Sequence, residues 1–201
     1  MIAAVQEEAP SESDWLARCR AGDAAAWRRL YDQHFPLVFR LSIRMGASER
    51  EAADVSQEVF LRVWRGLGSF RGDSMFRTWL YRITLNEVAR VAKEGAVRRA
   101  FGAVLALVIR EEAPATRAPD RLVEQAEALA ELEAILGRMK PKQRAVFVLF
   151  EIEELALEQI AEVLDCPLET VRSRLRHARA DVERLRRQQG MVRPRLQGES
   201  R

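Results

Sequence analysis

The chain has 201 residues, which is room for one large domain or two small ones, and 48% of them are apolar, enough to bury a core. The net charge is only +3, yet all but three of the 33 cationic residues are Arg. Because Arg binds phosphate through two parallel hydrogen bonds, this excess makes nucleic acid a candidate partner, although a GC-rich genome would produce the same excess of Arg. The two cysteines and two isolated histidines are too few for a disulfide framework or a metal site. The N-terminal stretch is acidic, unlike a secretion signal, and no apolar run approaches the roughly 20 residues that span a bilayer. We therefore expect a cytoplasmic protein.

Helical periodicity dominates the first half of the chain, and strand-like alternation is not sustained anywhere. Asp23 is placed to cap a helix whose apolar stripe runs over residues 27–45. Pro36 lies inside that stripe and predicts a kink, and Gly46 is a suitable residue to follow the helix end.

Ser48 and Glu51 have the spacing of a capping box and predict the start of a second long helix, which Gly66 ends. One side of this helix is predicted to carry six apolar residues: Ala52, Val55, Val59, Phe60, Val63 and Trp64. After a loop, a further helix is predicted from about Met75 into the nineties.

The stretch 96–119 is rich in helix-breaking residues and predicts a linker. Within it, residues 101–109 (FGAVLALVI) are unusually apolar, which indicates either a helix packed on a neighbour or a segment that needs a partner to cover it. The predicted organisation is therefore a helical domain at 13–95, a linker at 96–119, a helical domain at 120–187 and a basic tail at 188–201.

The second domain contains a helix-turn-helix pattern. Pro141 suits the first position of a helix, and residues 155–179 then predict two helices separated only by residues 165–167. The second of these presents four polar residues away from its apolar stripe: Arg172, Ser173, Arg176 and His177. In helix-turn-helix proteins such a face enters the DNA major groove. The alternative interpretation is a plain helical hairpin whose Arg side chains are only solvated.

The charges are distributed unevenly along the chain. Residues 71–99 carry seven cations and three acids, residues 111–169 six cations and fourteen acids, and residues 172–195 nine cations and two acids. Two basic segments with net charges of +4 and +7 thus flank an acidic one of −8. This pattern favours two separate anion-binding surfaces, although charged helix faces also cluster by chance.

Both domains resemble parts of the bacterial sigma-70 family of transcription initiation factors. The stretches KPKQRAVFVLFEIEELALEQIAEVL and TVRSRLRHARADVERL are similar to region four of that family, and DVSQEVFLRVW and FRGDSMFRTWLYRITLN are similar to region two. Because no long domain separates the two blocks, the layout resembles the extracytoplasmic-function (ECF) group. The resemblance covers residues 13–95 and 122–187 and implies an all-α fold of two small helical domains.

The resemblance also implies roles for particular residues. The family segment that binds the β′ clamp helices of RNA polymerase corresponds to Asp54, Gln57, Glu58 and Phe60. The positions near the −10 promoter element correspond to Phe70, Arg71, Arg77, Arg82 and Asn86. The positions that read the −35 element correspond to Arg172, Ser173, Arg176 and His177, and Arg144, near the start of the preceding helix, is expected to contact the DNA backbone beside them. Aromatics interleaved with Arg suit a melted strand, but Phe76 and Trp79 in the same stretch are expected in the core.

The implied partners are core RNA polymerase, through its β′ clamp helices and β flap, promoter DNA, and an anti-sigma factor held between the two domains, with the stretch 101–109 as a candidate contact. No cofactor is implied. A helix-turn-helix regulator that works without polymerase remains the alternative, and an enzyme is disfavoured because the sequence offers no nucleophile–base pair or phosphate-binding loop.

Four positions depart from the family pattern. Ala156 stands where a capping Ser is usual, and Asp165 stands at a turn position that is usually Gly, although Asp tolerates left-handed backbone. Glu169 replaces a usual Gly, and Arg90 replaces a usual Asp. An acid at 169 suits a helix N-terminus but would repel DNA phosphate.

Overall fold

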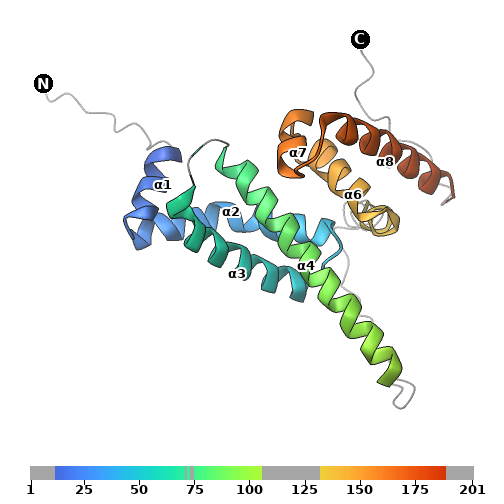
Figure 1. Ribbon diagram of the computed structural model, residues 1–201, viewed down its shortest axis with the longest axis horizontal. Helices are drawn as coiled ribbons and strands as arrows, with labels where there is room; N and C mark the ends of the chain where they lie inside the picture. Colours follow the sequence, from blue (N-terminus) through green and yellow to red (C-terminus); the bar gives the residue numbers. More distant parts are fainter. Residues whose placement is uncertain (1–11, 71, 73–74, 106–131, 189–201) are drawn as a thin grey trace, which may run out of the picture.

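A computed structural model describes residues 12–70, 72, 75–105 and 132–188, and within these ranges every regular element is a helix, as predicted (Figure 1). The elements of the first half are α1 (Glu12–Arg20), α2 (Ala24–Arg44), α3 (Glu49–Gly66), the short 3-10 helix η1 (Leu67–Ser69) and α4 (Phe76–Leu105). The elements of the second half are a helical stretch over 132–138, α6 (Pro141–Phe147), the π-helical turn η2 (Val148–Ile152), α7 (Leu157–Val163) and α8 (Leu168–Gln188).

Helix α2 begins and ends where the sequence predicts. Asp23 Oδ1 accepts hydrogen bonds from the backbone N–H groups of Ala25 (2.9 Å) and Ala26 (3.1 Å), which have no partner inside the helix. Beyond the last turn, Gly46 has φ +98°, a left-handed conformation that only glycine adopts without strain. The helix is continuous through Pro36.

The predicted capping box starts α3. Ser48 N donates to Glu51 Oε2 at 2.9 Å, and Ser48 Oγ accepts from Glu51 N at 3.3 Å. The two residues therefore satisfy each other's terminal groups. The α3 face that they orient packs between α2 and α4 through Val55, Val59 and Val63, which are fully buried.

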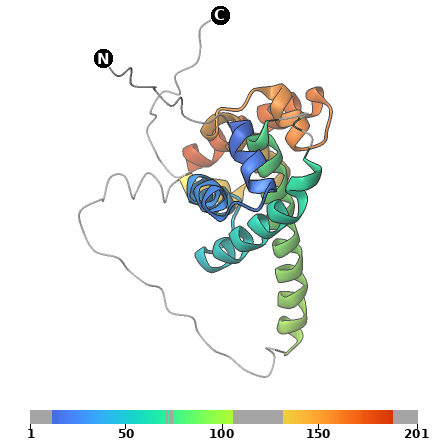
Figure 2. The same ribbon diagram turned by 90° about the vertical axis from the view of Figure 1, so that its left-hand side faces the viewer.

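Helix α4 is longer than predicted, because it continues past residue 95 to Leu105. Its C-terminal part projects beyond the other helices in both views (Figures 1 and 2). The sequence prediction ended near Gly95 because glycine disfavours helix by about 1 kcal/mol relative to Ala, a cost that its helix-forming neighbours outweigh. Part of the predicted linker at 96–119 is thus helical, while residues 106–119, and with them 106–109 of the apolar stretch, lie outside the described residues.

The second half is a helix-turn-helix built on α6, with Pro141 at its first turn as predicted. The turn between α7 and α8 contains Asp165 at φ +46°, so Asp takes the left-handed position that is usually filled by Gly. Ala156 has no capping oxygen, and the Gln159 side chain instead accepts from Ala156 N at 2.9 Å. Val171, Leu175 and Ala178 of α8 are buried in the shared core.

Candidate functional site

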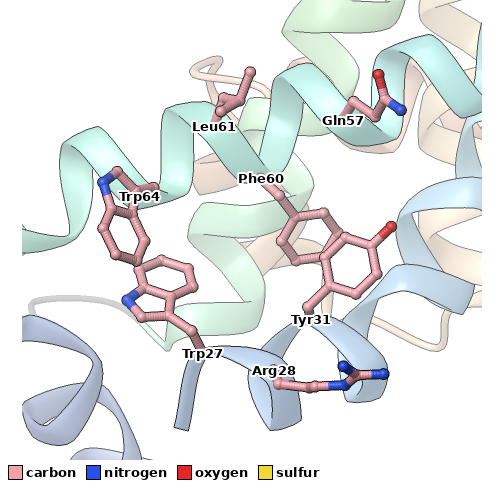
Figure 3. Close-up of a pocket in the computed structure, with 7 residues that line it drawn as sticks. All are labelled: Trp27, Arg28, Tyr31, Gln57, Phe60, Leu61 and Trp64. Atoms are coloured by element: carbon pink, nitrogen blue, oxygen red, sulfur yellow. The ribbon is translucent and has the colours of Figure 1, made fainter. Parts of the chain in front are cut away.

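An aromatic groove lies open between α2 and α3, with a volume of about 480 Å³. Figure 3 shows the residues that line it: Trp27, Arg28 and Tyr31 from α2, and Gln57, Phe60, Leu61 and Trp64 from α3. The Trp27 and Trp64 ring centroids are 4.5 Å apart, and those of Tyr31 and Phe60 are 4.6 Å apart. Two aromatic pairs, each with one ring from α2 and one from α3, therefore line the groove.

The groove is apolar and exposed. Trp64 is 55% exposed, Leu61 48% and Tyr31 37%, although each carries a large apolar side chain. Trp64 shares the apolar side of its helix with the core residues, as the sequence indicates, but its side chain leans against Trp27 at the margin of that stripe and does not enter the core. Exposed apolar surface with this concentration of aromatics is typical of a protein-binding site.

Two of the four residues that the resemblance assigns to polymerase binding line this groove, namely Gln57 and Phe60. Asp54 is exposed on the same helix, outside the lining. The Glu58 carboxylate accepts from Arg62 Nε at 3.1 Å, and Arg62 also lies 2.9 Å from the buried Glu87. Sequence reasoning did not identify four other groove residues as binding residues: Trp27, Tyr31, Leu61 and Trp64.

The loop after α3 carries an aromatic cluster. The Phe70 ring stacks on Trp79 at 4.9 Å and meets Phe76 edge-on at 6.1 Å. Phe76 is 2% exposed, so its predicted core role is confirmed, and Trp79 packs against the same core. Arg20 of α1 anchors the loop by donating to the carbonyl oxygens of Leu67 (3.1 Å) and Phe70 (2.8 Å), a contact that no sequence spacing indicated.

Three polar residues assigned to the −10 element lie along α4: Arg77, Arg82 and Asn86. Asn86 is exposed, whereas Arg71 lies outside the described residues. Arg77 Nε donates to the Tyr81 hydroxyl at 2.9 Å, and Arg82 Nη2 donates to the carbonyl oxygen of Glu162 at 2.6 Å. Arg90, one of the departures from the family pattern, pairs with Glu87 and Glu94 on its own helix.

The outward face of α8 carries the residues assigned to the −35 element. Arg172, Arg176 and His177 are exposed and Ser173 is half-buried, so the structure places all four on one side of the helix. The His177 ring contacts the Ser173 carbonyl oxygen at 2.7 Å. Arg172 is paired with Glu169 one turn earlier, so the acid that departs from the family pattern neutralises one of the four.

Arg144, also assigned to the −35 element, is buried. Its guanidinium donates to the carbonyl oxygens of Met45 (2.8 Å) and Gly137 (3.0 Å). Burial lowers the pKa of Arg144. In this arrangement its side chain ties the start of α6 to the end of α2, and it is not presented to a phosphate.

Within the described ranges, no three His, Cys, Asp or Glu side chains gather in a way that would hold a metal ion. The helices in those ranges include none that is both long and apolar enough to span a membrane.

Comparisons with known proteins agree with the resemblance. The family model for sigma-70 region 2 matches residues 30–96, and that for sigma-70 region 4 matches residues 129–182. The RNA polymerase sigma-H factor of Pseudomonas aeruginosa is 34% identical over 178 residues, which is 84% of this chain and 90% of that protein. The ECF RNA polymerase sigma-E factor of Haemophilus influenzae is 34% identical over 173 residues, 84% of this chain and 91% of that protein.

Solved structures share the fold. CnrH, in complex with the cytosolic domain of CnrY, matches with a TM-score of 0.64 and 24% identity over 86% of this chain and 94% of that one. The sigma factor RpoE of Bartonella quintana, in complex with the anti-sigma factor NepR, matches with a TM-score of 0.62 and 22% identity over 80% of this chain and 96% of that one. With both regions matched in order and full-length relatives above 30% identity, the chain belongs to the sigma-70 family, in its ECF group of RNA polymerase sigma factors.

Proposed function

We propose that this chain binds core RNA polymerase through the groove between α2 and α3 and directs the enzyme to promoters. The observation that carries the proposal is the exposed aromatic groove itself, whose lining residues from Tyr31 onward lie in the part of the chain that matches sigma-70 region 2. Trp64 and Leu61 provide apolar contact area, and Gln57 offers an amide at the edge. With Asp54 and Glu58 nearby, this surface suits a helical partner that is apolar in the centre and basic at the rim.

The second half of the proposal concerns the −10 element. Phe70 and the α4 residues Arg77, Arg82 and Asn86 receive a melted strand in this proposal, and Arg71, which lies outside the described residues, has the same role. Aromatic side chains stack on bases, Arg side chains follow the phosphates and an amide reads a base edge, so these residue types fit single-stranded DNA.

The −35 element is read in duplex form by α8. Arg176 and His177 are exposed on the face opposite the buried Val171 and Leu175, which is the geometry of a recognition helix. Arg172, Ser173 and Arg144 complete the proposed set, and both Arg172 and Arg144 must leave their present partners to contact DNA.

The remaining parts of the proposal follow from the same role. The chain acts in the cytoplasm, binds the β flap of polymerase as well as the β′ clamp helices, and is regulated by an anti-sigma factor. Promoter binding and strand capture require no covalent chemistry from this chain and no cofactor. The domains of the proposal are those predicted from the sequence, at 13–95 and 120–187.

Binding to core polymerase tests the proposal directly. Trp64→Ala should weaken binding of the full chain to bacterial core RNA polymerase about 30-fold, since a central aromatic of an interface typically contributes about 2 kcal/mol. Arg65→Ala is the matched control, because Arg65 is exposed on the same helix but does not line the groove. If both variants bind as the wild type does, the groove is not the polymerase site. If the wild type binds palindromic DNA tightly and never binds polymerase, the polymerase-independent regulator is the correct function.

A further inference from the structure

Arg20, the last residue of α1, reaches the backbone that follows α3. Its Nε donates to the carbonyl oxygen of Leu67 at 3.1 Å, and its Nη2 donates to that of Phe70 at 2.8 Å. Figure 1 shows α1 beside η1, in agreement with these contacts. One guanidinium therefore holds both ends of the turn 67–70, which carries the aromatic ring assigned to the −10 strand.

A helix-end contact accounts for only one of these two hydrogen bonds. Carbonyl groups at the end of a helix lack intrahelical partners, and an Arg side chain often supplies a donor there. The Gly66 carbonyl oxygen is already satisfied by the Ser69 hydroxyl at 2.9 Å, and the Leu67 oxygen also accepts from Phe70 N at 3.3 Å. The second hydrogen bond of Arg20 goes to Phe70, beyond the end of both α3 and η1, so it fixes the residue at which the chain leaves the turn.

The end of α1, from which Arg20 extends, is itself fixed. Gly22 has φ +83° and ends the helix, and its N–H donates to the Cys19 carbonyl oxygen at 3.1 Å. The indole N–H of Trp27 in α2 donates to the same oxygen at 3.0 Å, and the Cys19 side chain is buried. Because the residues around it are held in this way, Arg20 offers the turn a firm anchor.

The ring of Phe70 is held as well as its backbone. It stacks on Trp79, with the ring centroids 4.9 Å apart and the planes at 26°, and it meets Phe76 at 86°. Phe70 is half-buried, so part of the residue stays accessible. Two helices thus place this residue: α1 holds its carbonyl group and α4 holds its ring.

We infer that Arg20 is a positioning residue for promoter strand capture, which keeps Phe70 in the orientation in which its ring receives an unstacked base. A turn that already has its bound conformation pays no ordering cost when the strand binds. Arg20 lies before residue 30, where the match to sigma-70 region 2 begins. The inference rests on the proposed function, because it takes Phe70 to be a contact for the melted strand.

Three variants separate positioning from charge. Arg20→Ala removes both donors. Arg20→Lys keeps the charge, but an ammonium group lacks the planar fork that serves two carbonyl oxygens at once. Arg18→Ala is the matched control, because it removes an equal charge from the same helix. The Arg18 guanidinium pairs with Asp23 and lies 4.7 Å from the centroid of the Trp15 ring.

The first measurement is fluorine NMR of the full chain with fluorotryptophan at its 4 tryptophan positions, each resonance being assigned by replacing one tryptophan at a time with Phe. A positioning role predicts that Arg20→Ala moves the Trp79 resonance, because the Phe70 ring leaves the stack, while the Trp15 and Trp27 resonances stay in place. The control variant should leave the Trp79 resonance unchanged. Movement of the Trp15 and Trp27 resonances in Arg20→Ala would indicate that α1 as a whole is loosened, and would overturn the inference.

The second measurement is the affinity for a fluorescein-labelled single-stranded DNA of mixed sequence, measured by anisotropy with bacterial core RNA polymerase loaded with each variant. Arg20→Ala should weaken binding about fivefold, Arg20→Lys about twofold, and Arg18→Ala not at all, all with the same salt dependence. A phosphate contact by Arg20 would instead leave Arg20→Lys at the wild-type affinity. It would also make the slope of log affinity against log salt shallower by about 0.7 in Arg20→Ala, and that result would overturn the inference.

The two measurements also separate this inference from the proposed function. If the polymerase loaded with wild-type chain binds the strand and the one loaded with Arg20→Ala binds it equally well, the inference alone is overturned, whether or not the Trp79 resonance moves. If polymerase loaded with the wild-type chain binds the strand no better than core polymerase does, the proposed function fails and the inference fails with it.

Discussion

Gly46 and Arg144 are in contact across the two halves of the chain: a Cβ atom on Gly46 would stand 2.5 Å from Arg144 Nη1. Gly46 also has φ +98°, so a side chain there meets both backbone strain and a buried guanidinium. The guanidinium is at the same time held by the Met45 carbonyl oxygen, which limits its freedom to move aside.

Gly46→Ala is therefore expected to lower the free energy of unfolding of the first half by roughly 1–2 kcal/mol. Urea unfolding followed by circular dichroism measures the change. Gly68→Ala is the control, because a Cβ at Gly68 has no atom within 4 Å and its φ is not left-handed. Equal stability of the two variants would contradict both sources of the expected loss, the left-handed backbone at Gly46 and the close approach of Arg144.

The capping box of α3 gives a second prediction. Ser48→Ala removes the acceptor for Glu51 N and should cost about 1 kcal/mol of stability, because that N–H lacks an intrahelical partner. Ser48→Asp retains a capping oxygen and should restore most of the loss. The melting temperatures of the two variants distinguish the explanations. A lost cap lowers the melting temperature of Ser48→Ala only, whereas a general effect of changing the surface would lower that of Ser48→Asp equally.

His34 makes stability depend on pH. Burial, and to a smaller extent the nearby Arg77 charge, lower the pKa of His34 below its ordinary value of 6.5. The unfolded chain then takes up this proton before the folded chain does, so the stabilisation from neutral His34 is complete above about pH 6.5 and is lost as the pH falls toward the lowered pKa.

His34→Gln should accordingly reduce the loss of stability between about pH 7 and pH 5. Urea midpoints measured at several pH values for the wild type and the variant supply the comparison. An identical pH dependence of the two proteins would mean that His34 does not contribute to it.

The pairing of Glu169 with Arg172 predicts an effect on duplex DNA. Glu169→Gln removes an acid from the DNA-facing end of α8 and releases Arg172, so affinity for duplex DNA should rise about two- to fivefold, in line with the small energy of an exposed ion pair. Glu158→Gln, an exposed acid on α7, is the control. Anisotropy titrations at fixed salt measure both, and a larger gain for Glu158→Gln would contradict a local role for Glu169.

Local features of the fold could be predicted from sequence because their physics is local. Asp23, Ser48 and Gly46 act on groups within four residues of themselves, and Asp165 adopts the left-handed conformation that its side chain tolerates. The length of α4 could not be predicted, because the helix passes through two isolated glycines, Gly95 and Gly102, whose neighbours favour helix strongly enough.

The sequence predicts less well which side chains of a helix face are buried. Phe76 was correctly placed in the core, whereas the exposure of Trp64 could not be predicted, since periodicity identifies an apolar stripe but not which of its members a neighbouring helix covers. The contacts of Arg20 and Arg144 join residues far apart in sequence, so no spacing rule points to them.

Transcription with purified components tests the central claim most directly. Core RNA polymerase, the full chain and genomic DNA of the organism that encodes it are combined, and transcript start sites are mapped by sequencing. The account predicts a discrete set of starts that appears only when both polymerase and the chain are present, that is retained with Arg65→Ala and that is strongly reduced with Trp64→Ala. Start sites that are the same with and without the chain would contradict it.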